Sequence, residues 1–288
     1  MTTKKLAAIF ICCILTGGVM MMSAKAMGYK KSDGKTAAVS SEGRYLFSAG
    51  TEPFKNIKID GSSLQVQVLL ADGYAIEIDA ATPQDIKWSV SNGAITVKQE
   101  RRYDKGQREA DKIKISVPHD FNCGKTDIDL SSGKFEMAGI SCTEHAKIKL
   151  TSGKADISKG VFNKGIFEMS SGNISLEDIS FAVLDINMTS GKFKGRGISS
   201  KQTAIDITSG QMELDGSFSG RTDIIVTSGK INFNTDLPAS QYKKKISATS
   251  GQITINGKKF KSYEDAADAP NSITVNMTSG AAALQFAE

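Results

Sequence analysis

The feature that most constrains this chain is a tripeptide, Ser/Thr-Ser-Gly, that occurs eight times after residue 130. Successive glycines are 20, 19, 19, 19, 19, 22 and 29 residues apart, a regularity that random composition does not produce. A fixed period of this length is typical of repeat proteins, in which each unit contacts mainly its neighbours. The eight glycines are Gly133, Gly153, Gly172, Gly191, Gly210, Gly229, Gly251 and Gly280.

Apolar residues alternate with polar residues on both sides of each glycine. They stand three and five positions before it and two and four positions after it, which predicts two strands that each bury one face. The glycine between them predicts a tight corner, because a positive φ costs glycine no steric penalty. A third apolar position follows each corner in five of the units, at Ile140, Val161, Ile179, Ile198 and Phe218.

A unit of about 19 residues is too small to bury a core by itself, so stacking of the units must supply the core. The sequence therefore predicts an all-β chain folded as a parallel β-helix, or solenoid, with about 19 residues per turn. We expect a right-handed coil, because parallel crossovers are right-handed in nearly all proteins. The same spacing also fits an antiparallel meander with two-residue hairpins, which remains the alternative.

Residues 44–118 show the same alternation without the tripeptide and predict a less regular opening of strands, followed by the repeats over 119–288. Ser91-Asn92-Gly93 is either a hairpin turn or a degenerate corner. Residues 101–112 are too polar for a core and predict a solvated loop or a ligand-contacting loop. Residues 258–272 form a similar insertion before the last unit.

The N-terminus predicts export. Residues 1–26 read as a signal peptide, with two early lysines, an uncharged segment at 6–22 and small residues before position 27. The alternative is an uncleaved membrane anchor at 6–22, and residues 27–43 read as a flexible spacer in either case. Removal of 1–26 lowers the formal net charge from +5 to +2, which gives no case for nucleic-acid binding. We expect a periplasmic, cell-surface or secreted protein.

The strand-rich opening, the segment 112–118 (KIKISVP) and the tripeptide array resemble a bacterial putative-adhesin β-strand-repeat family, a domain of unknown function. The resemblance covers residues 44–288. It implies a parallel β-solenoid outside the cytoplasmic membrane, in some cases linked to envelope stress or surface attachment. It brings no catalytic residues with it.

Two cysteines remain after the leader, Cys123 and Cys142, and one repeat length separates them. In a solenoid such positions stack about 4.8 Å apart, within the Cα range of a disulfide. The sequence therefore predicts a bond between adjacent turns in an oxidising compartment, with two buried thiols as the alternative.

Few residues have the types and spacing that catalysis requires. His119 and His145 are the only histidines, and no close Cys or His pairs have the spacing of a zinc site. Glu136 and Asp156 occupy the same position of neighbouring units, as the acids of a polysaccharide-cleaving β-helix enzyme would. Nearby lysines favour plain ion pairs, so we expect no enzyme, no metal and no cofactor, and we keep a polysaccharide-active enzyme as the alternative.

Polar side chains, several of them lysine, directly follow the repeat glycines and predict a strip on one outer face. Such a strip suits an anionic ligand, and its lysines are Lys134, Lys154, Lys192 and Lys230.

The last strand, 281–286, is expected to be an open edge that self-associates or accepts a partner strand. The function predicted from sequence is non-enzymatic binding or scaffolding at the cell envelope, with an unidentified polymer, lipid or protein as partner and no nucleic acid.

Overall fold

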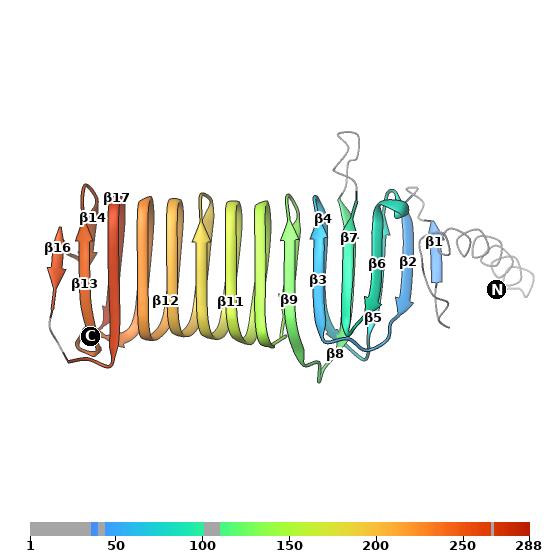
Figure 1. Ribbon diagram of the computed structural model, residues 1–288, viewed down its shortest axis with the longest axis horizontal. Helices are drawn as coiled ribbons and strands as arrows, with labels where there is room; N and C mark the ends of the chain where they lie inside the picture. Colours follow the sequence, from blue (N-terminus) through green and yellow to red (C-terminus); the bar gives the residue numbers. More distant parts are fainter. Residues whose placement is uncertain (1–35, 40–43, 101–109, 266–267) are drawn as a thin grey trace, which may run out of the picture.

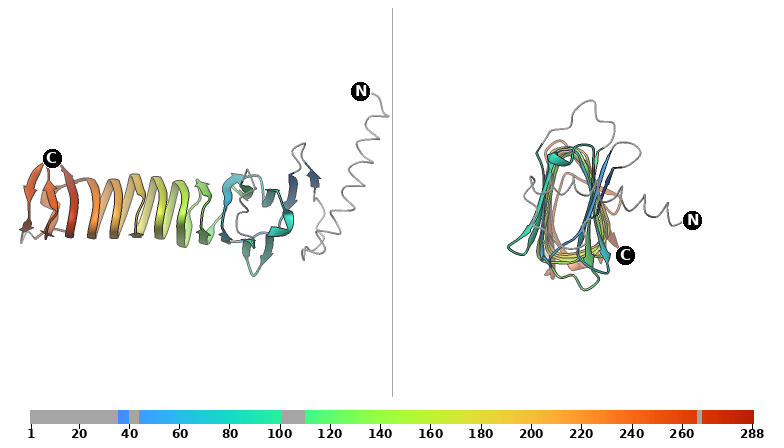
Figure 2. Two further views of the ribbon diagram at one scale, coloured as in Figure 1. Left: turned by 90° about the horizontal axis from the view of Figure 1, so that it is seen from above. Right: turned by 90° about the vertical axis from the view of Figure 1, so that its right-hand side faces the viewer.

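A computed structural model describes residues 36–39, 44–100, 110–265 and 268–288. These residues form one long coil of strands with a flattened cross-section and two broad faces (Figures 1 and 2). The described ranges contain no α-helix, only the short 3-10 turns η1 (Pro83–Asp85) and η2 (Ala239–Gln241). The signal peptide or anchor predicted within residues 1–26 lies outside the described residues.

The strands fall into an opening group, a central array and a closing group. The opening group is β1 (Thr36–Val39), β2 (Tyr45–Gly50), β3 (Asn56–Gly61), β4 (Leu64–Ala71), β5 (Ala75–Ala80), β6 (Ile86–Ser91), β7 (Ala94–Gln99) and β8 (Asp111–Pro118). The central array is β9 (Cys123–Leu130), β10 (Lys134–Ala138), β11 (Cys142–Met188) and β12 (Lys192–Pro238). The closing group is β13 (Tyr242–Ala248), β14 (Gln252–Ile255), β15 (Lys258–Phe260), β16 (Ser262–Glu264) and β17 (Asn271–Ala287).

Successive turns of the central array pair in parallel. Asn173 of β11 lies opposite Lys192 of β12 and Met188 lies opposite Ile207, so each position meets the one 19 residues later. The antiparallel meander is therefore wrong for the array, and a solenoid-like all-β fold is confirmed. The right hand of the coil stays a prediction.

The core is the column of inward side chains that the alternation predicts, with phenylalanines among its largest members. One predicted core position is wrong, because Val161 is 61% exposed and the adjacent Phe162 is buried. Gly160 precedes them at the corner, and a Cβ there would lie 2.9 Å from the Phe162 ring. The missing side chain leaves the space that this ring fills, stacked 5.6 Å from Phe181.

The repeat glycines stack on one another along one edge of the coil. A Cβ on Gly153 would lie 2.8 Å from the carbonyl oxygen of Gly133, and one on Gly210 would lie 2.9 Å from that of Gly191. Real Cβ atoms essentially never approach so closely. A positive φ, the reason expected from sequence, applies to only half of the row, at Gly172, Gly191, Gly210 and Gly280. Close approach between turns is the more general cause.

A second corner, which the sequence analysis missed, lies six residues after the glycine of a unit. The backbone there is left-handed at Gly139 (φ 73°), Lys159 (φ 57°), Asp178 (φ 53°) and Gly197 (φ 62°). Glycine and Asp at this fixed offset were the available signal, since both tolerate that conformation better than most residues. Each turn is thus bent at two defined points, which flattens the coil.

At both ends of the coil, the strands that lie side by side do not follow one another in the sequence. At the start, β3 lies between β9 and β7, and β4 lies between β10 and β8, all in parallel. The antiparallel strands β5, β2 and β1 then extend the β8 side, and β6 covers β7. Residues 36–39, predicted as spacer, therefore form a paired strand. Ser91-Asn92-Gly93 is a hairpin, with Asn92 and Gly93 both left-handed.

The expected open edge at 281–286 is wrong. Strand β17 pairs in parallel with β12 on one side and with β13 and β14 on the other (Figure 1). The insertion at 258–272 supplies β15 and β16, which cover β14 and β13 in antiparallel fashion. An Asn256-Gly257 hairpin turn, a signal that the sequence analysis missed, makes this return possible. The last strand is internal and offers no edge for self-association.

A buried ion pair helps to close the C-terminal end. Lys244, 6% exposed, contacts Asp265 at 2.7 Å and the carbonyl oxygens of Ala239 and Tyr242 at 2.8 and 2.7 Å. Burial pushes the pKa of the Asp265 carboxyl up, but hydrogen bonds from Lys244 and its charge outweigh burial and hold the pKa below its usual value.

We predict that Gly191→Ala lowers the free energy of unfolding by about 2–3 kcal/mol, because its Cβ would meet backbone atoms of Gly172 at a positive φ. Gly73→Ala is the matched control, since a Cβ there meets nothing within 4 Å. Urea denaturation measures both. Equal effects of the two substitutions would contradict the stacking argument.

We predict that acid weakens the C-terminal end through Asp265. Because its folded pKa is depressed, the contribution is complete above the unfolded value of about 3.9 and is lost as the pH falls through the folded pKa. Between about pH 4 and pH 2, the thermal unfolding midpoint of the wild type should therefore fall further than that of Asp265→Asn. If the midpoints of the two proteins fell by the same amount over this pH range, the proposed contribution of Asp265 would be contradicted.

Candidate binding surface

The four predicted lysines lie in one row on one broad face of the coil. Lys134 stands opposite Lys154 in the neighbouring turn, Asn173 opposite Lys192, and Lys230 opposite Ala281. Toward the N-terminal end the row continues from Lys134 through Gln65 and on to Lys112. We call these positions the lysine row: Lys112, Gln65, Lys134, Lys154, Asn173, Lys192, Gln211 and Lys230.

The charge of the lysine row is unevenly compensated. Lys134 contacts Glu136 at 2.5 Å and Lys154 contacts Asp156 at 2.8 Å. The hydrogen bond to Glu136 raises the pKa of Lys134, and the charges of Glu136 and Asp156 act in the same direction against slight desolvation. Within the described ranges, Lys192 and Lys230 make no ion pair. The uncompensated positive charge therefore lies toward the C-terminal half of the row.

Glu136 and Asp156 do face each other on neighbouring turns, as the enzyme alternative requires. Lys134 lies within 4.0 Å of both carboxylates, and both are partly exposed. The two carboxylates and Lys134 therefore form an ion-pair cluster, as the nearby lysines led us to expect.

A groove at the N-terminal end of the same face was not predicted from sequence. It has a volume of about 500 Å³ and runs over β2, β5, β8, β4 and β10. Its polar lining includes Gln65, Glu77, Lys112, Lys114 and Glu136, and the exposed Leu46 forms part of its wall. Because Gln65 and Lys112 belong to both features, the end groove and the lysine row form one continuous surface.

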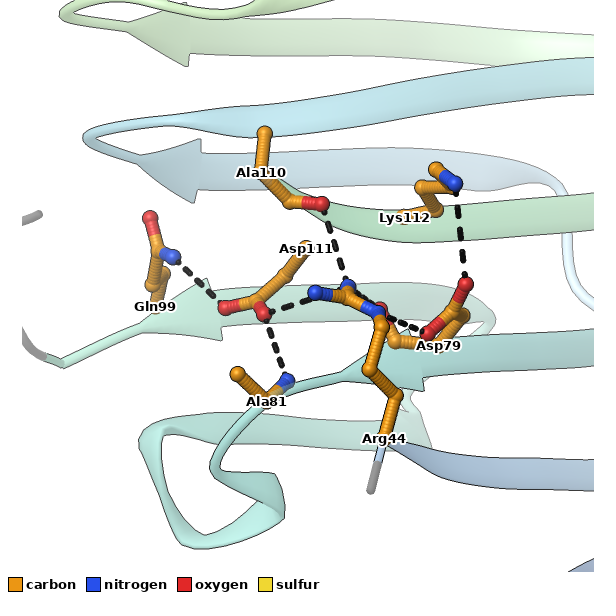
Figure 3. A network of polar contacts seen from close by, with 7 residues as sticks. All are labelled: Arg44, Asp79, Ala81, Gln99, Ala110, Asp111 and Lys112. Carbon is orange, nitrogen blue, oxygen red and sulfur yellow. Dashed lines mark hydrogen bonds and ion pairs between the residues drawn. The ribbon is translucent and has the colours of Figure 1, made fainter. Parts of the chain in front are cut away.

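A network around Arg44 holds the strands behind the end groove (Figure 3). Arg44 is 9% exposed, and its guanidinium contacts Asp79 at 2.6 Å and Asp111 at 3.7 Å. Asp111 in turn accepts hydrogen bonds from the Ala81 backbone N–H at 2.9 Å and from the Gln99 amide at 3.1 Å. The network thus joins the residue before β2 to β5, β7 and β8.

The network corrects the loop predicted at 101–112. Residues 101–109 lie outside the described residues, but Asp111 is 3% exposed and Lys112 is in β8, beside Asp79 at 3.8 Å. A carboxylate at the end of a polar run looks solvated in the sequence, since nothing nearby in the chain predicts its partner Arg44. The pairing of β2 with β5, and of β5 with β8, brings them together.

The opposite broad face has a smaller hollow of about 400 Å³. Ile166 and the 49% exposed Ile225 lie in it among carboxylates of Glu168, Asp185, Asp206 and Asp223. Asp185 pairs with Lys164 at 2.7 Å and Glu168 pairs with Lys147 at 2.7 Å. The hollow therefore combines acidic and apolar side chains, in contrast to the lysine row.

The remaining candidate residues lie outside the lysine row and the end groove. Cys123 and Cys142 are opposite each other on neighbouring turns, pointing into the core. His119 is exposed, and His145 contacts Asp127 at 2.9 Å. No described group of three or more Cys, His, Asp or Glu side chains could hold a metal ion. None of the described helical segments is long and apolar enough to cross a membrane.

Comparison with known proteins places this geometry among similar folds. The family model described as Toastrack DUF4097 matches residues 54–281. A "putative lipid binding protein" from Parabacteroides distasonis ATCC 8503 is 14% identical, with a TM-score of 0.53 over 85% of this chain and 97% of that one. A "putative adhesin" from the same strain is 11% identical, with a TM-score of 0.51 over 84% and 96%. No curated protein matches the chain.

A third similar structure is a "putative adhesin" from Bacteroides fragilis NCTC 9343. It is 10% identical, with a TM-score of 0.50 over 85% of this chain and 98% of that one. At such identities the likeness shows the fold alone.

We predict that Arg44→Met lowers the free energy of unfolding by about 3 kcal/mol, because it leaves the Asp111 carboxylate buried beside Asp79 without its cation. Lys149→Met is the control, since it breaks an exposed pair with Asp129 and should cost less than about 1 kcal/mol. Denaturant titration of both variants checks the difference. If Arg44→Met lowered the free energy of unfolding as little as the control does, a stabilising role for the network would be contradicted.

Proposed function

The chain belongs to the Toastrack DUF4097 family, as its sequence resemblance led us to expect, and we propose that it is an exported, non-enzymatic binding and scaffold protein of the cell envelope. Its location would be periplasmic, cell-surface or secreted, with residues 6–22 as an anchor if the leader is retained. The adhesin and lipid-binding names of structures with this fold support a binding role.

The observation that carries the proposal is the lysine row. Parallel pairing fixes the backbone positions of its lysines on one face, so their charges are spaced by whole turns before any ligand arrives. Binding then has to order only the side-chain rotamers of these lysines. Phosphate or carboxylate groups repeated along an envelope polymer, or carried by lipid head groups, match such a row in charge and in extended shape.

The ion pairs within the row identify the lysines that matter most. Lys134 and Lys154 already contact Glu136 and Asp156, so an anionic ligand must compete with these carboxylates. Lys192 and Lys230 face no such competitor among the described residues. We therefore assign the principal contacts to Lys192 and Lys230.

We predict that Lys192→Gln with Lys230→Gln reduces retention of the exported protein on anionic-lipid vesicles or on isolated cell wall by about tenfold, and that salt reduces retention by the wild type. Lys58→Gln with Lys243→Gln is the control, because it removes the same charge from the opposite face. Co-sedimentation with each material measures retention and separates the two ligand sources.

The Lys134→Gln, Lys154→Gln pair should fall between these two variants. If all three double variants, the control included, lost retention equally, only net charge would matter, and a role for the lysine row would be contradicted. Retention of the wild type on neither material would also contradict the proposal.

A further inference from the structure

Two thiols are buried side by side where the regular array begins. Cys142 of β11 is directly opposite Cys123 of β9 in parallel register. Neighbouring strands lie about 4.8 Å apart, and disulfides join Cα atoms about 4.4–6.8 Å apart. The backbone can therefore hold a bond between these residues without moving strands.

The side chains also point the right way. Cys123 is 0% exposed and Cys142 is 1% exposed, and both sulfurs contact the Thr126 hydroxyl, at 3.3 and 3.4 Å. Two sulfurs that share one small neighbour in the core lie on the same side of the sheet. The structure itself holds them as thiols.

The chemistry of the two thiols differs. A hydrogen bond from the Cys142 thiol lowers the pKa of Cys123 against the effect of burial, and Thr126 adds to the lowering. The same hydrogen bond raises the pKa of Cys142, and burial raises it further. These shifts belong to the folded pair, whose sulfurs interact directly; a thiolate of either residue is the form that attacks a disulfide.

The position adds a structural reason for a bond. The ladder between β9 and β11 changes register directly after the cysteines, between Cys142 and His145, which also accounts for the single 20-residue interval in the array. A side-chain hydrogen bond from Thr143 to the Cys123 carbonyl oxygen and the exposed Lys125–Glu144 ion pair, each at 3.1 Å, bridge this bulge. A covalent link at Cys123 and Cys142 would secure the junction where regular pairing is interrupted.

We propose that Cys123 and Cys142 form a disulfide between adjacent turns, made while the chain folds and then sealed in the core. The thiolate of one of the two cysteines attacks a disulfide of an oxidant, either a thiol–disulfide oxidoreductase or oxidised glutathione, and one sulfur of the oxidant leaves as a thiolate that takes up a proton. The second cysteine, once deprotonated, then attacks the mixed disulfide and releases the second thiol. Both cysteines are oxidised, and one oxidant disulfide is reduced to two thiols.

Burial makes the timing part of the proposal. An oxidant reaches the sulfurs only before the turns close over them, so the folded reduced protein resists oxidation. The state of the pair then records the compartment in which the chain folded.

The test uses the full chain, refolded from denaturant in mild detergent, either with a glutathione redox buffer or with a reductant. Trypsin separates the relevant cysteines from Cys12 and Cys13, because Cys123 lies in peptide 115–125 and Cys142 in peptide 135–147. After alkylation, mass spectrometry should find these two peptides joined, with two hydrogens lost, only in the redox-refolded sample. The thermal midpoint of that sample should lie about 5 °C or more above the reduced one.

A second arm tests the sealing. Protein folded in reductant and then moved to oxidised glutathione should keep both thiols at least tenfold longer than the same chain in denaturant. Cys123→Ser with Cys142→Ser should show no midpoint difference between the two refolding conditions. Two alkylated peptides after redox refolding would overturn the bond, and equally rapid oxidation of folded and unfolded chain would overturn the sealing.

Discussion

The fold depends on how closely one turn lies on the next at the Ser/Thr-Ser-Gly corner. At that corner the backbone of the neighbouring turn fills the space that a Cβ on the glycine would need. The carbonyl oxygen of Gly133, for example, lies where a Cβ on Gly153 would be. The backbone ladders can therefore continue through the corner, as the hydrogen bond from the Lys154 N–H to the Gly133 carbonyl shows. Because the corner fixes where each turn sits, every residue at a given offset from its glycine falls in the same row.

The lysine row is a direct result of that constraint. A lysine directly after a glycine is an ordinary exposed residue in a single turn, but repetition in register converts it into part of an extended charged surface. The carboxylates of the neighbouring row then decide which lysines keep a free charge. The opposite face, with Ile166 and Ile225 among acidic residues, has different chemistry, so the two faces of the coil are not equivalent.

Much of this could be predicted from the sequence, because period and alternation depend on local rules. The strand around Ile113 follows from alternation alone, and the strand around Ile205, the row of lysines and the stacked cysteines follow from the 19-residue repeat. The order of the turns at the ends does not, since every turn has similar edges and periodicity cannot tell which neighbour each one selects. The internal place of β17 and the Arg44–Asp111 contact arise from that order, so both escaped prediction.

The ends show how the coil avoids open edges. Strands β3 and β4 lie between strands that come later in the sequence, and β17 lies between strands that come earlier. Detaching either end therefore requires breaking strand pairs on both sides of the inserted strands. Short charged strands, β15 and β16, then cover part of the final turn, as expected for strands that must not pair with another molecule. Buried cations, Arg44 at one end and Lys244 at the other, tie these closing elements together.

The measurement that tests the account most directly is the set of distances between spin labels along the lysine row. With Lys134 as the reference, the register places Lys192, Lys230 and Gln252 at three, five and seven turns, the last across β17. At about 4.8 Å per turn the account predicts separations of about 14, 24 and 34 Å, which increase linearly. Separations that do not increase in this order would contradict the stacked-turn arrangement and the lysine row with it.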